Sequence, residues 1–261
     1  MDDTEGVELY HSRLVGMLES LWGDGWLSPG GPEEVARLLD GFDLKGKSVL
    51  DIGCGAGGVD RLLAGRYGVG YVTGIDVEDT VLHQAQQGIA RAGLSDRVGL
   101  VKVVPGPLPF PPATFDVVFS KDSIVHIPDK HALMREIHRV LKPGGWFIAS
   151  DWLIGHDGEP SPAMKAYIAA EGLDFGMASP KRYAEAMAAA GFADVTTRSR
   201  NAWYREKAKE ELASLRGPLY AKLSEQLGAE FVDHNIAIWT RMLPVLETGE
   251  HCPTHLKARK P

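Results

Sequence analysis

Apolar and polar positions follow two alternating patterns along the first 150 residues, and their order predicts the fold. Short apolar runs typical of buried parallel strands alternate with segments whose apolar residues recur at helical spacing. The predicted strands are 48–52, 71–76, 98–104, 115–120 and 146–150, and the predicted helices between them are 59–67, 79–92 and 129–141, the last ended by Pro143-Gly144-Gly145. Strands and helices that alternate at these distances indicate an α/β fold with a mostly parallel, Rossmann-like sheet.

Helical patterns also precede and follow this core. Two predicted helices, 7–22 and 32–41, come before the first strand, and a glycine-rich loop at 23–31 joins them. After residue 152 the pattern predicts helices at 162–171 and 180–190, a strand at 193–197, one or two charged helices within 204–227 and a candidate strand at 254–258. We therefore predict an N-terminal helical lid at 1–44, a cofactor-binding core at 45–200 and a C-terminal helical extension with a candidate last strand at 201–261.

A glycine turn follows the first predicted strand. Gly53, Gly55 and Gly58 have G-x-G-x-x-G spacing, and an apolar-periodic helix comes next. Glycines let the backbone turn sharply and approach a ligand, while a helix N-terminus offers unpaired N–H groups. Because dinucleotide-binding folds share this spacing, the turn alone predicts a nucleotide-like ligand without naming it.

Two acidic residues narrow the choice of ligand. Asp51 lies two residues before Gly53, where its carboxylate would repel a pyrophosphate and attract an ammonium group. S-adenosylmethionine carries an ammonium and a sulfonium but no phosphate, so the sequence favours it over NAD or FAD. Asp76 ends the second predicted strand, at the distance expected for a carboxylate that binds ribose hydroxyls. A helix N-cap is the other interpretation of Asp76, and both roles are compatible.

Composition excludes several classes of partner. The 261 residues carry a net charge of −7 with no run of lysine and arginine, which argues against nucleic acid and anionic membranes. No apolar run approaches bilayer length, and the acidic start differs from a signal peptide. Cys54 and Cys252 lie far apart, so we expect neither a disulfide framework nor a metal site, and we predict a cytoplasmic protein. The sequence carries no signal for the oligomeric state.

Several short motifs together resemble those of class I S-adenosylmethionine-dependent methyltransferases. The matching segments, within about 45–200, are VLDIGCG at 49–55, Asp76, LPF at 108–110 and VLKPGG at 140–145. A narrower resemblance, to the phosphoethanolamine N-methyltransferases, rests on short matches across nearly the whole chain. These matches are LSPGG at 27–31, FSKDSIVHI at 119–127 and Trp239.

This resemblance implies a seven-stranded sheet whose sixth and seventh strands are antiparallel, with a substrate pocket between an N-terminal lid and the core. It places a catalytic pair at Tyr10 and His126, with Asp122 four residues before the histidine, and we also assign Val77 and Ser120 to the cofactor site. Chemistry supports His126 independently, because an amine attacks a methyl group only through a neutral lone pair, and histidine accepts protons near neutral pH. Tyr10 alone would be interpreted as a core residue of an amphipathic helix.

This chain departs from the family pattern at two places. The aspartate that receives the adenine amino group in the family is Val104 here, so that amine would need another acceptor within the cofactor site. The family's phosphate-binding arginine, tyrosine and lysine correspond to Glu171, Leu173 and Met242 in an ungapped match. Since a phosphate needs cationic donors, we predict that phosphoethanolamine is a poor substrate.

Tryptophans are expected near the predicted cleft. Five of them lie in or near segments that should border it: Trp22, Trp26, Trp152, Trp203 and Trp239. Their rings can attract a methylated ammonium or sulfonium, although packing of the lid against the core is the favoured explanation for any single one. We assign Trp26, Trp152, Trp239 and Glu171 to substrate binding.

The sequence thus predicts a methyltransferase that uses S-adenosylmethionine and a small polar acceptor. The first choice of acceptor is the nitrogen of a small amine or amino acid. One alternative is the sulfur of a thioether or thiol, such as methionine, which as a thioether carries no proton to remove. Another is a regulatory protein that binds the cofactor without turnover.

Overall fold

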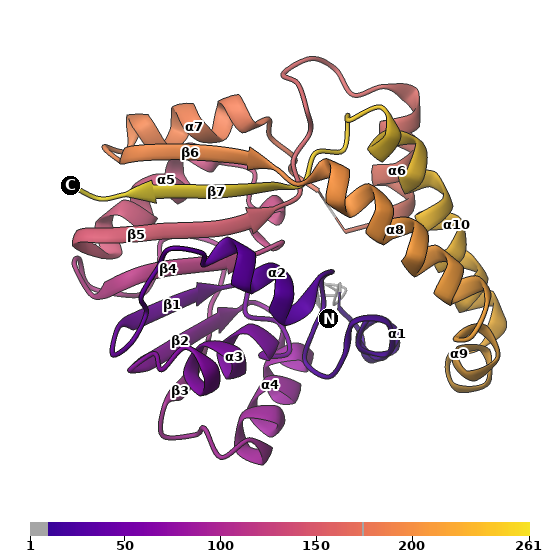
Figure 1. The fold of residues 1–261 in the computed structure, drawn as a ribbon, viewed down its shortest axis with the longest axis horizontal. Coiled ribbons are helices and arrows are strands. Elements are labelled where there is room, and N and C mark those ends of the chain that lie inside the picture. Colours follow the sequence, from indigo (N-terminus) through magenta and orange to yellow (C-terminus); the bar gives the residue numbers. More distant parts are fainter. Residues whose placement is uncertain (1–9, 174) are drawn as a thin grey trace, which may run out of the picture.

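A computed structural model describes residues 10–173 and 175–261, which form a seven-stranded sheet in the order β3-β2-β1-β4-β5-β7-β6. The strands are β1 (Ser48–Ile52), β2 (Tyr71–Asp76), β3 (Val98–Lys102), β4 (Phe115–Lys121), β5 (Leu141–Asp151), β6 (Ala193–Ser199) and β7 (Thr254–Arg259). Strand β7 is antiparallel to both of its neighbours, and the pairs from β3 to β5 are parallel. The predicted mostly parallel sheet with an antiparallel pair at its end is confirmed (Figure 1).

Helices cover both faces of the sheet because alternate strand residues point to opposite sides. Leu50 and Ile52 join the apolar cluster under α5 and α7, whereas Val49 and Val72 join the cluster under α2, α3 and α4. These helices are α2 (Gly31–Leu38), α3 (Gly58–Arg66), α4 (Asp79–Arg91), α5 (Lys130–Val140) and α7 (Pro180–Ala189). Asp51 shares the α3 side with Val49, which determines the surroundings of its carboxyl group.

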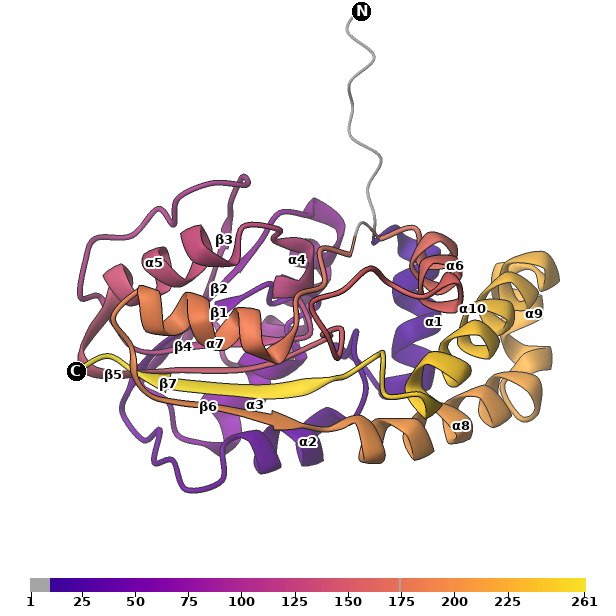
Figure 2. The same ribbon diagram turned by 90° about the horizontal axis from the view of Figure 1, so that it is seen from above.

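A second group of helices lies beyond the carboxyl ends of the parallel strands (Figures 1 and 2). It consists of α1 (Ser12–Trp22), α6 (Pro162–Glu171), α8 (Asn201–Arg216), α9 (Tyr220–Leu227) and α10 (Ala229–Glu247). Helix α10 packs against α6, α8 and α9, and α1 packs against α8 and α9. Their apolar residues form a third cluster, so segments from both ends of the chain build one helical layer.

The structure adds one helix to the predicted elements and extends one strand. No element was predicted at 229–247. One face of α10 is nevertheless buried at steps of three or four residues, as a helix face requires: Val232, Asn235, Trp239, Met242 and Leu246. Pro143-Gly144-Gly145 separates no elements, because β5 begins at Leu141, directly after α5. Gly144 has a φ of 77°, and a shift in the β4–β5 register accommodates this turn within the strand.

The C-terminal segment completes the core sheet. The predicted boundary at residue 200 separates β7 from the rest of the core, yet β7 lies between β5 and β6 and pairs with both. Leu256 and Ala258 of β7 belong to the same apolar cluster as Leu50. The last strand therefore belongs physically to the core.

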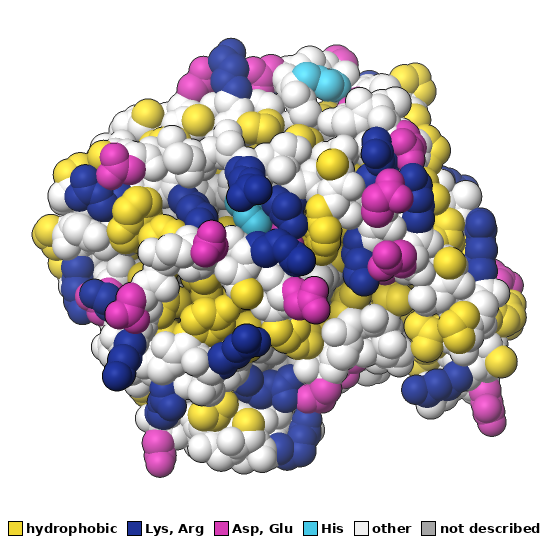
Figure 3. Space-filling view, viewed as in Figure 1, with side chains coloured by type: hydrophobic (Ala, Val, Ile, Leu, Met, Phe, Trp, Pro, Cys, Tyr) yellow, Lys and Arg dark blue, Asp and Glu magenta, His cyan; other side chains and the backbone are white. Residues whose placement is uncertain are grey.

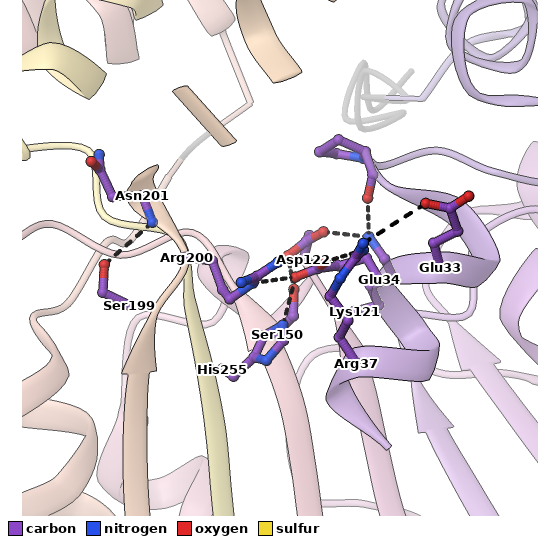
Figure 4. A network of polar contacts seen from close by, with 11 residues as sticks. Glu33, Glu34, Arg37, Lys121, Asp122, Ser150, Ser199, Arg200, Asn201 and His255 are labelled. Carbon is purple, nitrogen blue, oxygen red and sulfur yellow. Dashed lines mark hydrogen bonds and ion pairs between the residues drawn. The ribbon is translucent and has the colours of Figure 1, made fainter. Parts of the chain in front are cut away.

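A buried carboxylate connects the lid to the core and to the helical layer (Figure 4). Glu34 of α2 is 2% exposed, and it accepts hydrogen bonds from Arg200 Nε at 2.6 Å and Nη2 at 2.8 Å. His255 Nε2 on β7 lies 2.8 Å from Glu34 Oε1, the same oxygen that accepts from Arg200 Nε. Burial alone would raise the pKa of Glu34, but the bonds from His255 and Arg200 outweigh it and lower the pKa to about 2.

The surface carries charges of both signs. On the face shown in Figure 3, basic and acidic side chains are interspersed, with apolar side chains between them. Within the described ranges, no helix is both long and apolar enough to cross a bilayer.

We expect the Arg200–Glu34 pair to be essential for stability. Arg200→Met leaves a buried carboxylate with one partner fewer and should lower the free energy of unfolding by about 3 kcal/mol. Arg37→Met is the matched control, because Arg37 contacts the same Glu34 at 3.5 Å from a half-exposed position, and its loss should stay below about 1 kcal/mol. Denaturant unfolding measures both values, and equal losses would contradict this role of Arg200.

Candidate active site

The glycine turn is held by the strand beside it. Gly53 and Cys54 donate their N–H groups to the Ile75 carbonyl at 2.8 and 3.0 Å. The Asp76 carboxylate accepts the N–H of Gly55 at 2.9 Å and that of Val77 at 2.8 Å. Asp76 therefore fixes the turn while it stands at the carboxyl end of β2.

Two of the glycines are required by close contacts. A Cβ at Gly53 would lie 1.6 Å from Ser123 Oγ, and one at Gly58 would lie 2.5 Å from the carbonyl oxygen of Gly25. The Gly58 N–H donates to that Gly25 carbonyl at 3.0 Å. The loop at 23–31, which we call the lid loop, therefore rests directly on the glycine turn.

Two buried carboxyl groups face each other beneath the turn. Asp51 is 1% exposed and lies next to Gly74 in the β1–β2 register, and Asp60 of α3 is fully buried over Gly74. Among the described residues, no donor bonds to any of their four carboxyl oxygens, so the two groups can bond only through a shared proton. Burial raises the pKa of Asp51 well above its usual range and that of Asp60 to about 7. Sequence reasoning missed Asp60, whose position one turn into a helix gave no signal.

A cavity of about 260 Å³ lies between the lid and the carboxyl ends of the strands, and we call it the lid pocket. Six aromatic side chains line its wall: Tyr10, Trp22, Trp152, Phe175, Phe231 and Trp239. Its polar lining residues are His11, Ser28, Asp122, His126, Glu171, His234 and Asn235. Leu27 joins the two sites, because it lines the lid pocket and lies 3.0 Å from the Cβ position of Gly55.

The structure brings Tyr10 and His126 together in this pocket. His126 ends a short 3-10 helix, η1 (Ile124–His126), just after β4, and Tyr10 immediately precedes α1. The two rings meet edge to face, with centroids 6.2 Å apart and an interplanar angle of 87°. Burial, and then the charge of Glu171, raise the pKa of Tyr10, so its hydroxyl stays protonated at neutral pH.

Asp122 lines the lid pocket, but its hydrogen bonds go to other residues than His126. Its carboxylate accepts from Lys121 Nζ at 2.7 Å and from Ser150 Oγ (Figure 4). Lys121 Nζ also donates to Ser28 Oγ at 2.7 Å and to the Pro29 carbonyl at 2.8 Å. Asp122 has a φ of 54°, which costs a non-glycine residue about 1 kcal/mol or more. The residue is thus held in a strained position by contacts that also fasten the lid loop.

The tryptophans divide between the pocket and the core. Trp152 and Trp239 line the lid pocket, whereas Trp26 packs against Gly58 in the cluster under α2 and α3. Trp22 also lines the pocket, and its ring centroid is 6.2 Å from that of Trp239. The indole N–H groups of Trp22 and Trp239 both donate to the Glu211 carboxylate. Nothing in the sequence had indicated a role for Glu211.

The three positions that correspond to the family's phosphate-binding residues have two different surroundings. Glu171 and Leu173 line the lid pocket, and burial raises the pKa of Glu171 to about 7. Met242 is buried, and its sulfur accepts hydrogen bonds from the hydroxyls of Tyr167 and Tyr204 at 3.5 and 3.7 Å. Within the described part of the chain, the pocket lining includes no lysine or arginine.

The remaining predicted cofactor residues lie at or near the strand ends. Val104 is 77% exposed beyond β3, and Val77 is exposed beyond β2. Ser120 is buried in β4 and donates its hydroxyl to the Ile52 carbonyl at 2.8 Å. In the ranges 10–173 and 175–261, no cluster of three histidine, cysteine or acidic residues is arranged to hold a metal ion.

Comparison with known proteins agrees with this geometry. Residues 50–149 match the model of a methyltransferase domain. A phosphoethanolamine N-methyltransferase of Triticum aestivum is 34% identical over 241 residues, which are 91% of this chain and 46% of that protein. Phosphoethanolamine N-methyltransferase 2 of Caenorhabditis elegans is 31% identical over 97% of this chain and 57% of its own length.

A solved structure matches almost the whole fold. Phosphoethanolamine N-methyltransferase 2 of Haemonchus contortus, in complex with phosphomonomethylethanolamine and S-adenosylhomocysteine, superposes with a TM-score of 0.88. It is 26% identical, and the match covers 96% of this chain and 58% of that one.

The chain therefore contains, at 50–149, a methyltransferase domain of the class I S-adenosylmethionine-dependent type, as its motifs predict. Within this class it is similar to the phosphoethanolamine N-methyltransferases, and it spans about half the length of the curated relatives it matches.

The Asp51–Asp60 pair should make stability depend on pH. Since the folded-state pKa of Asp60 is raised to about 7, the stability present below pH 4 is lost as the pH rises toward 7. Asp60→Asn keeps a hydrogen bond to Asp51 without a titrating proton, so at pH 8 it should stabilise the fold by on the order of 2 kcal/mol.

Thermal unfolding at pH 5 and pH 8 measures this effect. The gap between Asp60→Asn and the wild type should widen by several degrees between the two pH values, while the exposed Asp96→Asn control shows no change. A gap that stays constant would show that the two carboxyls do not share a proton.

Proposed function

We propose that this protein transfers a methyl group from S-adenosylmethionine to the nitrogen of a small polar amine. The observation that carries the proposal is the placement of His126 and Tyr10 in a pocket that adjoins the glycine turn through Leu27. The relatives and the bound molecules of the Haemonchus contortus structure support the same reaction class.

The residues around the glycine turn fit this cofactor. Asp51 has two buried carboxyl oxygens with no donor in the described structure, and an ammonium group would supply one. Asp76 keeps acceptor capacity for ribose hydroxyls, and the exposed side chains of Val77 and Val104 offer apolar surface to an adenine ring. Gly53, Gly55 and Gly58 allow close approach of the backbone. When bound, S-adenosylmethionine supplies an electrophilic methyl group.

The residues of the lid pocket manage the acceptor and its proton. A protonated amine has no lone pair for attack, so its nitrogen must lose a proton before or during the transfer. The imidazole of His126 is the group we assign to accept that proton, and the protonated Tyr10 hydroxyl orients the acceptor. The negative charge of Glu171 favours a cationic amine in the pocket, whereas that of Asp122 is offset by Lys121. The lid loop and the aromatic wall exclude water from the reacting atoms.

Replacing His126 and Tyr10 tests the proton-transfer role. His126→Ala should lower kcat by about a hundredfold, the usual scale for a general base, with little change in cofactor affinity. Tyr10→Phe should also lower kcat, and the double variant should lose less than the two single losses combined, because the pair acts as a unit. Release of S-adenosylhomocysteine with a panel of small amines and thioethers measures kcat.

His131→Ala, on the exposed side of α5, is the matched control and should behave as the wild type. Normal kcat in His126→Ala across neutral pH would overturn the general-base assignment and would favour a sulfur acceptor. If the loss in the double variant equals the sum of the two single losses, His126 and Tyr10 have separate roles.

Cofactor affinity tests the two carboxylates. Asp51→Asn and Asp76→Ala should each weaken binding of S-adenosylmethionine by on the order of 1.5–3 kcal/mol, because each removes a charged acceptor. Asp79→Asn is the control, since this exposed carboxylate beyond β2 pairs with Lys102. Calorimetric titration measures the affinities, and unchanged binding in both variants would remove the basis for the cofactor site.

Location in the cytoplasm is part of the same proposal. Cys54 and Cys252 are both free thiols, which is typical of proteins in reducing compartments.

A further inference from the structure

We infer that the lid pocket selects a small ammonium compound without a phosphate group, and that Glu211 sets this preference as a positioning residue behind Trp22 and Trp239. The inference rests on the proposed function, because it treats the lid pocket as the acceptor site. The inference specifies the charge of the acceptor. A cationic acceptor without a phosphate differs from the phosphate-bearing acceptor that the resemblance to the phosphoethanolamine enzymes would suggest.

Glu211 joins three helices behind the aromatic wall. It lies on α8 with 3% of its surface exposed. Its Oε1 accepts the indole N–H of Trp22 on α1 at 2.8 Å, and its Oε2 accepts that of Trp239 on α10 at 3.2 Å. The carboxylate therefore fixes two indole rings that both line the lid pocket.

This arrangement favours a cation in front of the rings. Indole is the aromatic side chain that attracts cations most strongly, and a carboxylate bound to its N–H adds negative charge behind the ring. Burial raises the pKa of Glu211 to about 7, although the two indole bonds oppose the shift, so the group is ionised in mildly alkaline solution.

The other charges around the pocket act in the same direction. Glu171 lines it, and Asp122 lines it in an ion pair with Lys121, so Glu171 is the acidic group that adds to the attraction of a cation. The described lining residues include no lysine or arginine. The lysines that influence Glu211 are Lys207, which pairs with Glu210 at 3.0 Å, and Lys121, whose ammonium is held by Asp122. A phosphate dianion would enter an acidic pocket without the cationic donors it needs.

Three probes separate charge from shape. Choline is a small quaternary ammonium compound, 3,3-dimethyl-1-butanol has the same shape with a neutral carbon in place of nitrogen, and phosphocholine adds the phosphate. At pH 8 the wild type should bind choline about tenfold or more tightly than the neutral analogue, and phosphocholine should bind more weakly than choline. Quenching of tryptophan fluorescence, checked by calorimetry, measures the three dissociation constants.

Variants then locate the source of the preference. Glu211→Gln should reduce the choline preference to about threefold or less, and Trp239→Phe, which removes one indole N–H but keeps an aromatic ring, should reduce it partly. Glu210→Gln removes the exposed carboxylate next along α8 and should leave the ratio unchanged. A merely structural role of Glu211 would weaken choline and the neutral analogue alike, so the ratio would not move.

The results also separate this inference from the proposed function. Binding of S-adenosylhomocysteine is measured on the same samples. If the wild type does not bind it, both the proposed function and this inference are overturned. If S-adenosylhomocysteine binds, then equal affinity for choline and its neutral analogue, tighter binding of phosphocholine, or an unchanged ratio in Glu211→Gln overturns the cation preference alone.

Discussion

The lid pocket depends on the three hydrogen bonds by which Lys121 holds the lid loop to the carboxyl ends of the strands. Lys121 ends β4, and its ammonium group bridges Ser28 and Pro29 of the lid loop to Asp122. This contact places α1 over the sheet, which brings Tyr10 to His126 and Leu27 to the glycine turn. The contacts of Glu34 with Arg200 and His255 hold α2, the helix that follows the lid loop, against β7 and the start of α8.

Buried acids are the common feature of both halves of the site. Asp51 and Asp60 lie under the glycine turn, and Glu171 and Glu211 lie at the lid pocket. Burial raises the pKa of each, so the fold holds carboxyl groups that are unfavourable while no cation is near them. Both proposed ligands are cationic, and their binding would relieve this penalty. Local destabilisation of this kind is typical of functional sites.

The fold agrees with that of the relatives, whereas the lining of the lid pocket differs from what a phosphate-bearing acceptor needs. The lining positions at Glu171 and Leu173 supply no cation for a phosphate. Such a difference is physically reasonable, because the sheet and the glycine turn bind the cofactor, whereas separate helices supply the acceptor wall.

The sequence by itself determined the parallel part of the core. Alternating strands and helices, the glycine spacing and Asp51 followed from local patterns, because strand burial and turn geometry depend on neighbouring residues. The motif match placed His126 and Tyr10, which are 116 positions apart in the chain. Only the tertiary structure showed that Trp26 packs in the core, that Asp122 binds Lys121 and Ser150, and that Asp60 and Glu211 are buried beside the two sites. Those contacts join elements distant in sequence, and which side chains meet across helices is decided by packing, which leaves no periodic signal.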